Sequence, residues 1–462
     1  MIARLGAALS RFFAKTAPDP FVIAVALTLL TALLALVFGY DDAPSLGAKA
    51  TALLDAWRGP DGLWKFLAFG MQMALILVTG HALAASAPVR ALLTRLASIP
   101  RSPRAACALV GLTAALFGLV NWGLGLIVGA LLAREVARAL KARSIRVHGP
   151  LLAASGYMGL LVWHGGLSGS APLKMTTKAE AADILPARML DGAGDPAVPL
   201  SQTLFSPMNL VVALGLLVLI PITLALLNPA RDDQITEMPA ADDPAPTPDD
   251  TPTERSIPQR LDRSPIVVWA LALALGAAFV RFGLDRGLTR LGPNEINIAM
   301  LALGLACHGS VRSYLKAAED GARGCAGIIL QFPLYAGIMG MAESAGLIES
   351  FATWLGSFAT ETTAPLLTFT SAAIVNLFVP SGGGQWGIQG PIALDAGAAV
   401  GVEPAKMIMS VAYGDQLTNM LQPFWALPLL AITKVRARDI VGYTCVVMLV
   451  AAAWMVLALL LF

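Results

Sequence analysis

The chain has little charge for its length. Of its 462 residues only 13% are Asp, Glu, Lys or Arg, and 56% are hydrophobic, whereas a soluble domain normally carries about 25% charged residues. The charges are also clustered, and uncharged runs of about 20 residues, long enough to cross a bilayer as a helix, lie between the clusters. This pattern excludes an ordinary soluble enzyme and predicts an all-α polytopic membrane protein.

Two further classes are excluded by what is missing. The sequence has no basic tract that would bind nucleic acid, and its formal net charge is +2. Its cysteines lie in apolar segments without paired spacing, which is typical of small core residues rather than of a disulfide or metal framework. They are Cys107, Cys307, Cys325 and Cys445. We therefore expect no cofactor and no nucleic-acid partner.

The chain begins with a short amphipathic segment, residues 1–20. Its apolar side chains alternate with Arg4, Arg11 and Lys15, so we expect it to lie along the cytoplasmic interface. The apolar run that follows, 21–40, lacks a small-residue cleavage site and is predicted to be an uncleaved first span.

Loops rich in Lys and Arg favour the cytoplasm. By this rule the N-terminus, 88–104 and 134–146 all lie inside. The segment 105–133 connects two inside loops without a charge and is too short for two full crossings, so it is predicted to be a re-entrant hairpin with its tip at Asn121–Gly125. Non-helical backbone at membrane depth is tolerated only inside protein or beside a water-filled cavity, which makes this hairpin a functional signal.

The next span, 149–173, is predicted to exit as a helix broken at His164–Pro172, and span 206–227 ends the first repeat, 21–227. Residues 228–263 are rich in proline and acid. Such a composition cannot bury a core, and it predicts a flexible cytoplasmic linker.

The second repeat, 264–462, shows the same order. A second uncharged hairpin is predicted at 364–394 with its tip at Pro380–Gly390, and a second broken helix at 405–432, interrupted at Asp415–Pro423. The charge pattern orients the two series oppositely, with the N-terminus cytoplasmic and the C-terminus periplasmic. Inverted repeats with discontinuous helices are typical of secondary transporters. The sum is nine spans and two hairpins, with 266–284 as an extra span.

The four interruptions carry most of the polar groups at membrane depth. Helix N-termini there attract anions, and glycine lets the backbone approach a ligand closely. No Lys or Arg falls within them, which favours a small monocarboxylate held by neutral dipoles, although helix ends also hold dicarboxylates. The candidate substrate-binding residues are Asn121, Trp122, Gly123, His164, Gly165, Ser168, Ser170, Ser381, Gly382, Gly383, Gly384, Gln385 and Trp386.

Ionisable groups buried in a membrane are costly and usually functional. Candidate coupling-ion residues are Asn376, Asp415, Thr418 and Asn419, and His81 and His164 are candidates for a proton relay. Structural alternatives stand beside each of these. The same pattern fits His81 as a neutral histidine that is hydrogen-bonded to a neighbouring helix. It also fits Asp415 as a helix cap, and Trp122 and Trp386 as packing residues.

Two sequence runs resemble those of one family. These runs are Asn376-Leu-Phe-Val-Pro-Ser-Gly-Gly-Gly-Gln-Trp-Gly-Ile-Gln-Gly-Pro391 and Asp415-Gln-Leu-Thr-Asn-Met-Leu-Gln-Pro-Phe-Trp-Ala-Leu-Pro428, and Pro18-Asp-Pro20 and His164–Leu173 extend the likeness. They resemble the bacterial short-chain fatty acid transporters, which move acetoacetate, butyrate and related monocarboxylates across the inner membrane. The resemblance implies a homodimer with a scaffold domain and an elevator-like transport domain. It also implies substrate and a coupling cation, Na⁺ or H⁺, at paired hairpin tips and broken helices.

Three other functions are compatible with parts of the sequence. A C4-dicarboxylate or citrate carrier is the alternative among transporters. A channel is the second alternative, but the paired broken helices favour alternating access. Gly166-Leu-Ser-Gly169 matches a pattern of intramembrane serine hydrolases, which need a histidine to activate the serine. His164 is only four residues from Ser168, and a hydrolase leaves the second repeat unexplained, so we expect no enzyme activity.

Overall fold

The computed structural model describes residues 2–40, 43, 45–176, 178, 181, 197–229, 231–239, 257–287 and 291–462. The regular structure of these residues is helical, which confirms the predicted all-α class. Seven of the described helices are long and apolar enough to cross a membrane: α2, α4, α6, α12, α14, α17 and α23.

The first half runs from α1 to α12. Its elements are α1 (Ile2–Thr16), α2 (Pro20–Phe38), α3 (Leu46–Arg58), α4 (Leu67–Ala85), α5 (Ala87–Ala97), α6 (Pro103–Val120), α7 (Trp122–Ala142), α8 (Gly149–Gly156), η1 (Met158–Leu161), η2 (Trp163–Gly165), α9 (Ser170–Leu173) and α12 (Pro207–Leu226).

The second half runs from the linker to the C-terminus. Its elements are η3 (Asp232–Gln234), α13 (Ile257–Asp262), α14 (Pro265–Arg286), α15 (Pro293–His308), α16 (Val311–Ala322), α17 (Ala326–Ser344), α18 (Leu347–Gly356), α19 (Ala364–Asn376), α20 (Gly382–Ala399), α21 (Pro404–Thr418), η5 (Asn419–Leu421), α22 (Pro423–Thr433) and α23 (Ala437–Leu461).

The first hairpin consists of α6 and α7, which pack against each other along their lengths. It is longer than the predicted 105–133, because α7 continues through its basic residues to Ala142. Its turn is the single residue Asn121 rather than the predicted Asn121–Gly125. Trp122 to Gly125 form the first turn of α7, since the Asn121 side chain caps that helix and lets it start at once.

Close helix packing explains why glycines recur in this hairpin. A methyl group placed on Gly129 of α7 would lie 2.1 Å from the carbonyl oxygen of Gly156 in α8. The two backbones are therefore in contact, and a side chain at this position would push them apart. Small residues at such crossings are typical of membrane helix packing.

The second hairpin consists of α19 and α20. Its turn covers residues 377–381, so the predicted tip Pro380–Gly390 is wrong from Gly382 onward. Ser381 caps α20 by accepting a hydrogen bond from the backbone N–H of Gly384, and the glycines after it remain helical through Pro391. Pro391 therefore does not end α20, because a proline inside a membrane helix is tolerated where neighbouring groups satisfy the backbone that it leaves unpaired.

Both helices are interrupted where the sequence predicted a break, but the bounds of the breaks differ from the predicted ones. The first break begins at Tyr157, where α8 gives way to η1 and η2, and not at His164. The second break is confined to residues 419–422, because Asp415 to Thr418 complete the last turn of α21. The predicted break at Asp415 is therefore too early.

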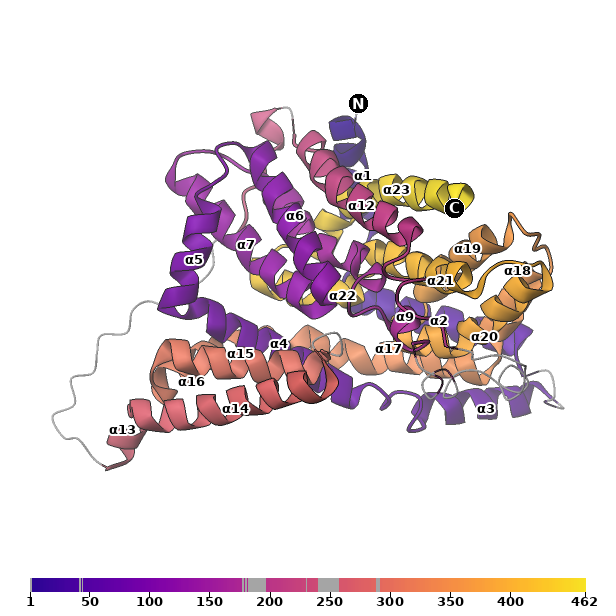
Figure 1. The fold of residues 1–462 in the computed structure, drawn as a ribbon, viewed down its shortest axis with the longest axis horizontal. Coiled ribbons are helices and arrows are strands. Elements are labelled where there is room, and N and C mark those ends of the chain that lie inside the picture. The colour runs from indigo at the N-terminus through magenta and orange to yellow at the C-terminus, as the bar shows by residue number, and fades with distance from the viewer. Residues whose placement is uncertain are drawn as a thin grey trace.

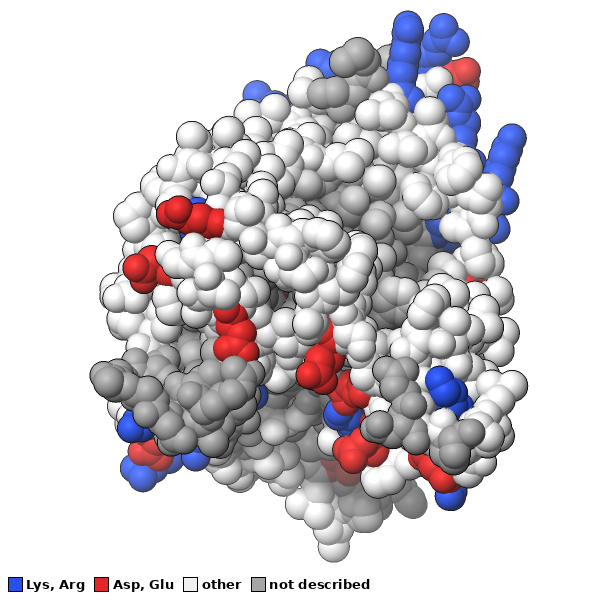
Figure 2. Space-filling model, turned by 90° about the vertical axis from the view of Figure 1, so that its right-hand side faces the viewer, with Lys and Arg blue, Asp and Glu red and all other residues white. Residues whose placement is uncertain are grey.

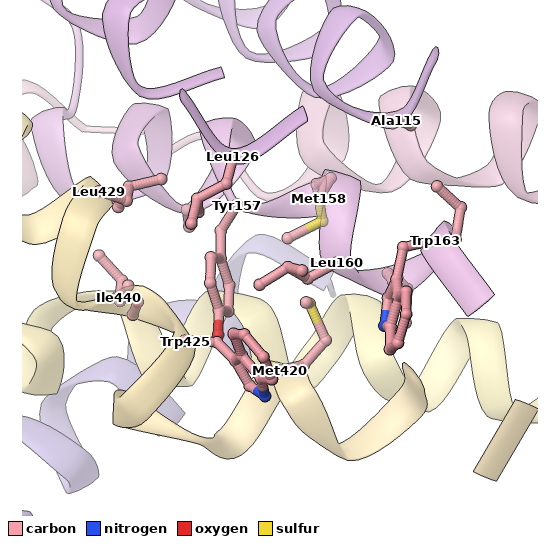
Figure 3. Close-up of a cluster of buried hydrophobic side chains, with 14 of the residues drawn as sticks. Ala115, Leu126, Tyr157, Met158, Leu160, Trp163, Met420, Trp425, Leu429 and Ile440 are labelled. Carbon is pink, nitrogen blue, oxygen red and sulfur yellow. The ribbon is translucent and has the colours of Figure 1, made fainter. Parts of the chain in front are cut away.

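The elements gather into two groups. Figure 1 shows α4, α14, α15 and α16 side by side at the lower left, and α1, α12 and α23 together at the top. In the same view α9, α21 and α22 lie near the centre, whereas α19 and α20 of the second hairpin lie at the right. One continuous apolar core runs through the centre. Figure 3 shows Tyr157, Met158 and Leu160 of the first break facing Met420 of the second break and Trp425 of α22, the helix that follows it.

The outer surface fits a bilayer environment. Much of α2 and most of α14 is exposed, and their exposed side chains include Leu29, Leu33, Ile266 and Leu273. Figure 2 shows broad uncharged surface, with basic side chains gathered at its upper right edge. Exposed apolar helices of this kind are stable where lipid surrounds them.

The interfacial segment and the linker both have defined neighbours. Helix α1 packs against α23, where the Ser10 hydroxyl donates to the carbonyl of Asp439 over 3.4 Å. The described linker residues 231–239 return to α7 and α8, where Glu237 pairs with Lys141 at 3.4 Å and Arg146 at 3.8 Å. Residues 240–256 of the predicted acidic linker lie outside the described residues, and residues 257–262 form α13.

Candidate functional site

The two breaks meet at a buried ionisable pair. The Nδ1 atom of His164, in η2, lies 3.0 Å from Oδ1 of Asp415, in the last turn of α21. His164 is 0% and Asp415 1% exposed. A histidine and an aspartate from opposite halves are thus removed from water together, which is costly unless their charges and hydrogen bonds are satisfied.

The neighbouring hydrogen bond defines the form of the imidazole. The backbone N–H of Ala171 donates to Nε2 of His164 over 3.0 Å, so Nε2 is an acceptor and the ring proton resides on Nδ1. Nδ1–H then donates to the Asp415 carboxylate. Its second oxygen, Oδ2, is buried with no hydrogen-bond partner among the described residues. The pair therefore contains a neutral histidine and a carboxylate with one free coordination point.

Residues that sequence reasoning missed support this pair. The side-chain oxygen Oε1 of Gln416 accepts from the backbone N–H groups of His164 at 3.0 Å and Gly165 at 3.2 Å. Asn209, in α12, donates to the carbonyl of Gly165 over 2.9 Å, and the Tyr413 hydroxyl donates to Oδ1 of Asn209 over 3.0 Å. The only sequence signal was that these polar residues lie in otherwise apolar spans.

The second hairpin reaches the pair through its first glycine. A methyl group on Gly382 would lie 2.7 Å from Cη2 of Trp163 and 3.0 Å from Cε1 of His164. The Trp163 and His164 rings stack with centroids 4.3 Å apart. Gly382 is therefore required for the tip to approach the first break so closely.

The predicted coupling-ion residues lie together around Asn376. The Nδ2 atom of Asn376 lies 2.8 Å from the carbonyl oxygen of Asp415, 3.1 Å from Oγ1 of Thr418 and 2.9 Å from Oδ1 of Asn419. The Tyr157 hydroxyl of the first break donates to the carbonyl of Asn419 over 2.9 Å. Side-chain and backbone oxygens of both breaks thus converge at the end of α19.

The tip of the first hairpin has its polar atoms engaged within the protein. Oδ1 of Asn121 accepts from the backbone of Gly123 at 3.0 Å and Leu124 at 3.2 Å. Oγ of Ser168 accepts from the backbone N–H of Trp122 over 3.1 Å. Because Nε2 of His164 already accepts from Ala171, this imidazole does not serve as a base for Ser168.

Three aromatic and amide candidates pack against neighbouring elements: Trp122, which is partly buried, and Gln385 and Trp386, which are buried. The Trp122 ring packs against Trp425 with centroids 5.2 Å apart. Trp386 is fully buried, and Nε2 of Gln385 donates to the carbonyl of Ala372 over 2.9 Å. Gln385 and Trp386 thus lie below the tip of the second hairpin, between α19 and α20, because α20 starts earlier than the sequence indicates.

The two predicted relay histidines are not joined. His81, in α4, packs against α16, where a methyl group on Gly321 would lie 3.1 Å from its Cβ. Among the described residues no hydrogen bond connects it with His164. Ser170 and Gly383 are brought together: a methyl group on Gly383 would lie 3.9 Å from Oγ of Ser170.

Comparison with known proteins assigns the whole chain to one group. The family model described as "Short chain fatty acid transporter" matches residues 1–462. A relative from Escherichia coli (strain K12), named "Putative short-chain fatty acid transporter", is 38% identical over 467 residues and covers 100% of both chains. A relative of the same name from Haemophilus influenzae is 36% identical over 454 residues and covers 98% of both.

Two solved structures are more distantly similar. The YdaH transporter of Alcanivorax borkumensis has 16% sequence identity and a TM-score of 0.40, with 95% of this chain and 98% of that chain covered. MtrF of Neisseria gonorrhoeae has 14% identity and a TM-score of 0.36, with 97% of each chain covered.

Proposed function

The chain belongs to the short-chain fatty acid transporter family, and from this premise we propose that it is a cation-coupled secondary transporter of butyrate, acetoacetate and similar monocarboxylates. It is a membrane transporter rather than an enzyme. We propose the coupling to a cation, the identity of the substrates and the transport mechanism.

The observation that carries the coupling is the free oxygen of Asp415. A carboxylate that is 1% exposed and faces a neutral imidazole needs a positive charge nearby, because an uncompensated charge in the membrane is costly. A proton or Na⁺ at Oδ2 supplies that charge. Thr418 and Asn419, which follow Asp415 closely in the chain, carry side-chain oxygens that accept from Asn376, and oxygen is the ligand atom that hard cations prefer.

Cation binding in turn favours the substrate. A monocarboxylate is repelled by the bare Asp415 carboxylate and accepted once the cation neutralises it, so the two bind together. We place the substrate where the second hairpin meets the first break, at Gly382, Gly383 and Ser170. Gly165, Ser168, Ser381 and Gly384 form the surrounding backbone and hydroxyl positions.

Transport requires that this site face each side of the membrane in turn. We propose that the paired hairpins and broken helices move as one elevator-like body within a homodimer. The protein then lies in the bacterial inner membrane with its N-terminus cytoplasmic and its C-terminus periplasmic. The order of hairpin, broken helix and final helix in both halves supports this arrangement.

Uptake into proteoliposomes tests the proposal. Purified protein should accumulate labelled butyrate, and either an inward Na⁺ gradient or an inward proton gradient should drive it. Empty liposomes and labelled succinate provide the controls. Succinate accumulation without butyrate uptake would instead identify a dicarboxylate carrier, and uptake that is indifferent to both gradients would overturn the coupling.

A further inference from the structure

Lys174 lies at the end of the first break and takes part in none of the contacts described for the candidate site. Lys174 follows α9 directly, and its backbone N–H donates to the carbonyl of Ser170 over 3.1 Å. Its side chain is exposed. Within the described part of the chain it forms neither an ion pair nor a side-chain hydrogen bond. The ammonium group is therefore available to a ligand.

The tip of the second hairpin brings this lysine to the site. A methyl group on Gly383 would lie 4.0 Å from Cε of Lys174 and 3.9 Å from Oγ of Ser170. One residue earlier, Gly382 touches His164. The tip backbone thus passes between an exposed cation and the buried His164–Asp415 pair.

Charge explains what this arrangement can bind. The neutral His164 leaves Asp415 as the charge at the centre of the site, and a substrate anion adds a second negative charge. A lysine at the edge of the site attracts such an anion and lowers the repulsion from Asp415. Its flexible stem allows the ammonium to reach a ligand over the glycine backbone.

We propose that Lys174, together with the Ser170 hydroxyl, binds the carboxylate of the substrate at the Gly383 edge of the hairpin tip. This inference rests on the proposed transport of monocarboxylates. One ammonium and one hydroxyl match the two oxygens of a single carboxylate. The lysine therefore contributes affinity for anionic substrates, and the cation at Asp415 contributes coupling.

Kinetics of butyrate uptake in proteoliposomes test the role of Lys174. The proposed interaction between the Lys174 ammonium and the substrate carboxylate is partly exposed to water. Lys174→Gln should therefore raise KM roughly five- to tenfold and change the maximal rate less. Lys174→Arg should keep KM within about twofold of the wild type, because it keeps the charge. Lys15→Gln removes an equal charge from exposed α1 and provides the matched control, with kinetics like those of the wild type.

Salt provides a readout that a purely structural lysine would not move. The wild-type KM should rise with ionic strength because salt screens the attraction, and this rise should be weaker in Lys174→Gln. An unchanged KM and an unchanged salt dependence in Lys174→Gln would overturn the inference while leaving the proposed function intact. Absence of butyrate uptake by the wild type would instead overturn the proposed function.

Discussion

Nδ1 of His164 and Oδ1 of Asp415 lie 3.0 Å apart although 251 positions separate the two residues in the sequence. Each is contributed by a different interrupted helix, and the Ala171 N–H holds the imidazole in the tautomer that donates to the carboxylate. The pair therefore links the two halves of the chain chemically as well as spatially.

Asp415→Asn should abolish cation-driven accumulation while leaving the protein folded. The amide keeps the volume and an oxygen toward His164 but removes the charge that the cation neutralises. We expect accumulation to fall at least about tenfold, equivalent to about 1.4 kcal/mol, in a gradient-driven uptake assay. Size-exclusion chromatography controls for folding, and full gradient-driven accumulation by the folded variant would contradict the coupling role.

His164→Asn tests which nitrogen matters. The Asn side-chain nitrogen occupies nearly the place of Nδ1 and keeps the donor to Asp415, but it leaves the Ala171 N–H without its acceptor. We expect partial transport, compared with near loss in His164→Leu, which removes both bonds. Equal activity of the two variants in uptake assays would show that the bond to Asp415 is not what transport requires.

Two glycines of α20 provide a matched pair. Gly382→Ala places a methyl group 2.7 Å from Trp163 and 3.0 Å from His164, whereas a methyl group on Gly387 meets nothing within 4 Å. Gly382→Ala should therefore reduce butyrate uptake about tenfold or more, since overpacking typically costs about 1–3 kcal/mol. Gly387→Ala should behave like the wild type. Comparable losses in both variants would attribute the effect to α20 as a helix rather than to the contact.

Asn376→Ala should destabilise the protein more than an exposed amide change does. It removes the buried donor to Asp415, Thr418 and Asn419, and unsatisfied buried groups cost about 1–3 kcal/mol each. Thermal unfolding in detergent should show a clearly lower midpoint. Asn294→Ala, which breaks an exposed bond to Gln72, should shift it little, and equal shifts would contradict the central role of Asn376.

His148 should make the folding stability of the protein depend on pH. This residue precedes α8, its Nδ1 accepts from the backbone of Thr236 over 3.0 Å, and Nε2 lies 2.9 Å from the Tyr443 hydroxyl. Burial lowers the pKa of His148 from 6.5 to about 4, although Asp439 opposes this shift.

The direction of this pH dependence follows from the number of protons bound by the folded and unfolded chains. Between pH 6.5 and about 4 the unfolded chain binds a proton that the folded His148 does not, so stability is full above pH 6.5 and falls by up to about 3 kcal/mol as the pH decreases. Thermal unfolding at pH 7.5 and 5.0 measures this loss. His148→Gln should flatten the dependence, and an equally steep dependence in that variant would assign the loss to other groups.

The polar interruptions were visible in the sequence, but their neighbours were not. Charge spacing indicated two hairpins, and glycine and proline marked the breaks near His164 and Asp415. The exact turns were misplaced because Asn121 and Ser381 act as caps, so that the glycines after them continue as helix. Gln416 and Asn209 stood out only as polar residues in apolar helices, and such a residue does not show which element it will face. Lys174 follows a four-residue helix, and no local pattern indicated that it reaches the hairpin tip.

The sequence alone determined that this chain is a polytopic helical membrane protein of the short-chain fatty acid transporter family. Hydropathy, charge clustering and local motifs are properties of contiguous residues, and they are sufficient for that conclusion. Only the tertiary structure decided that Asp415 meets His164, that Gly382 touches both His164 and Trp163, and that Lys174 reaches the hairpin tip. These contacts join segments far apart in the chain, and their geometry depends on how the helices pack rather than on any local pattern.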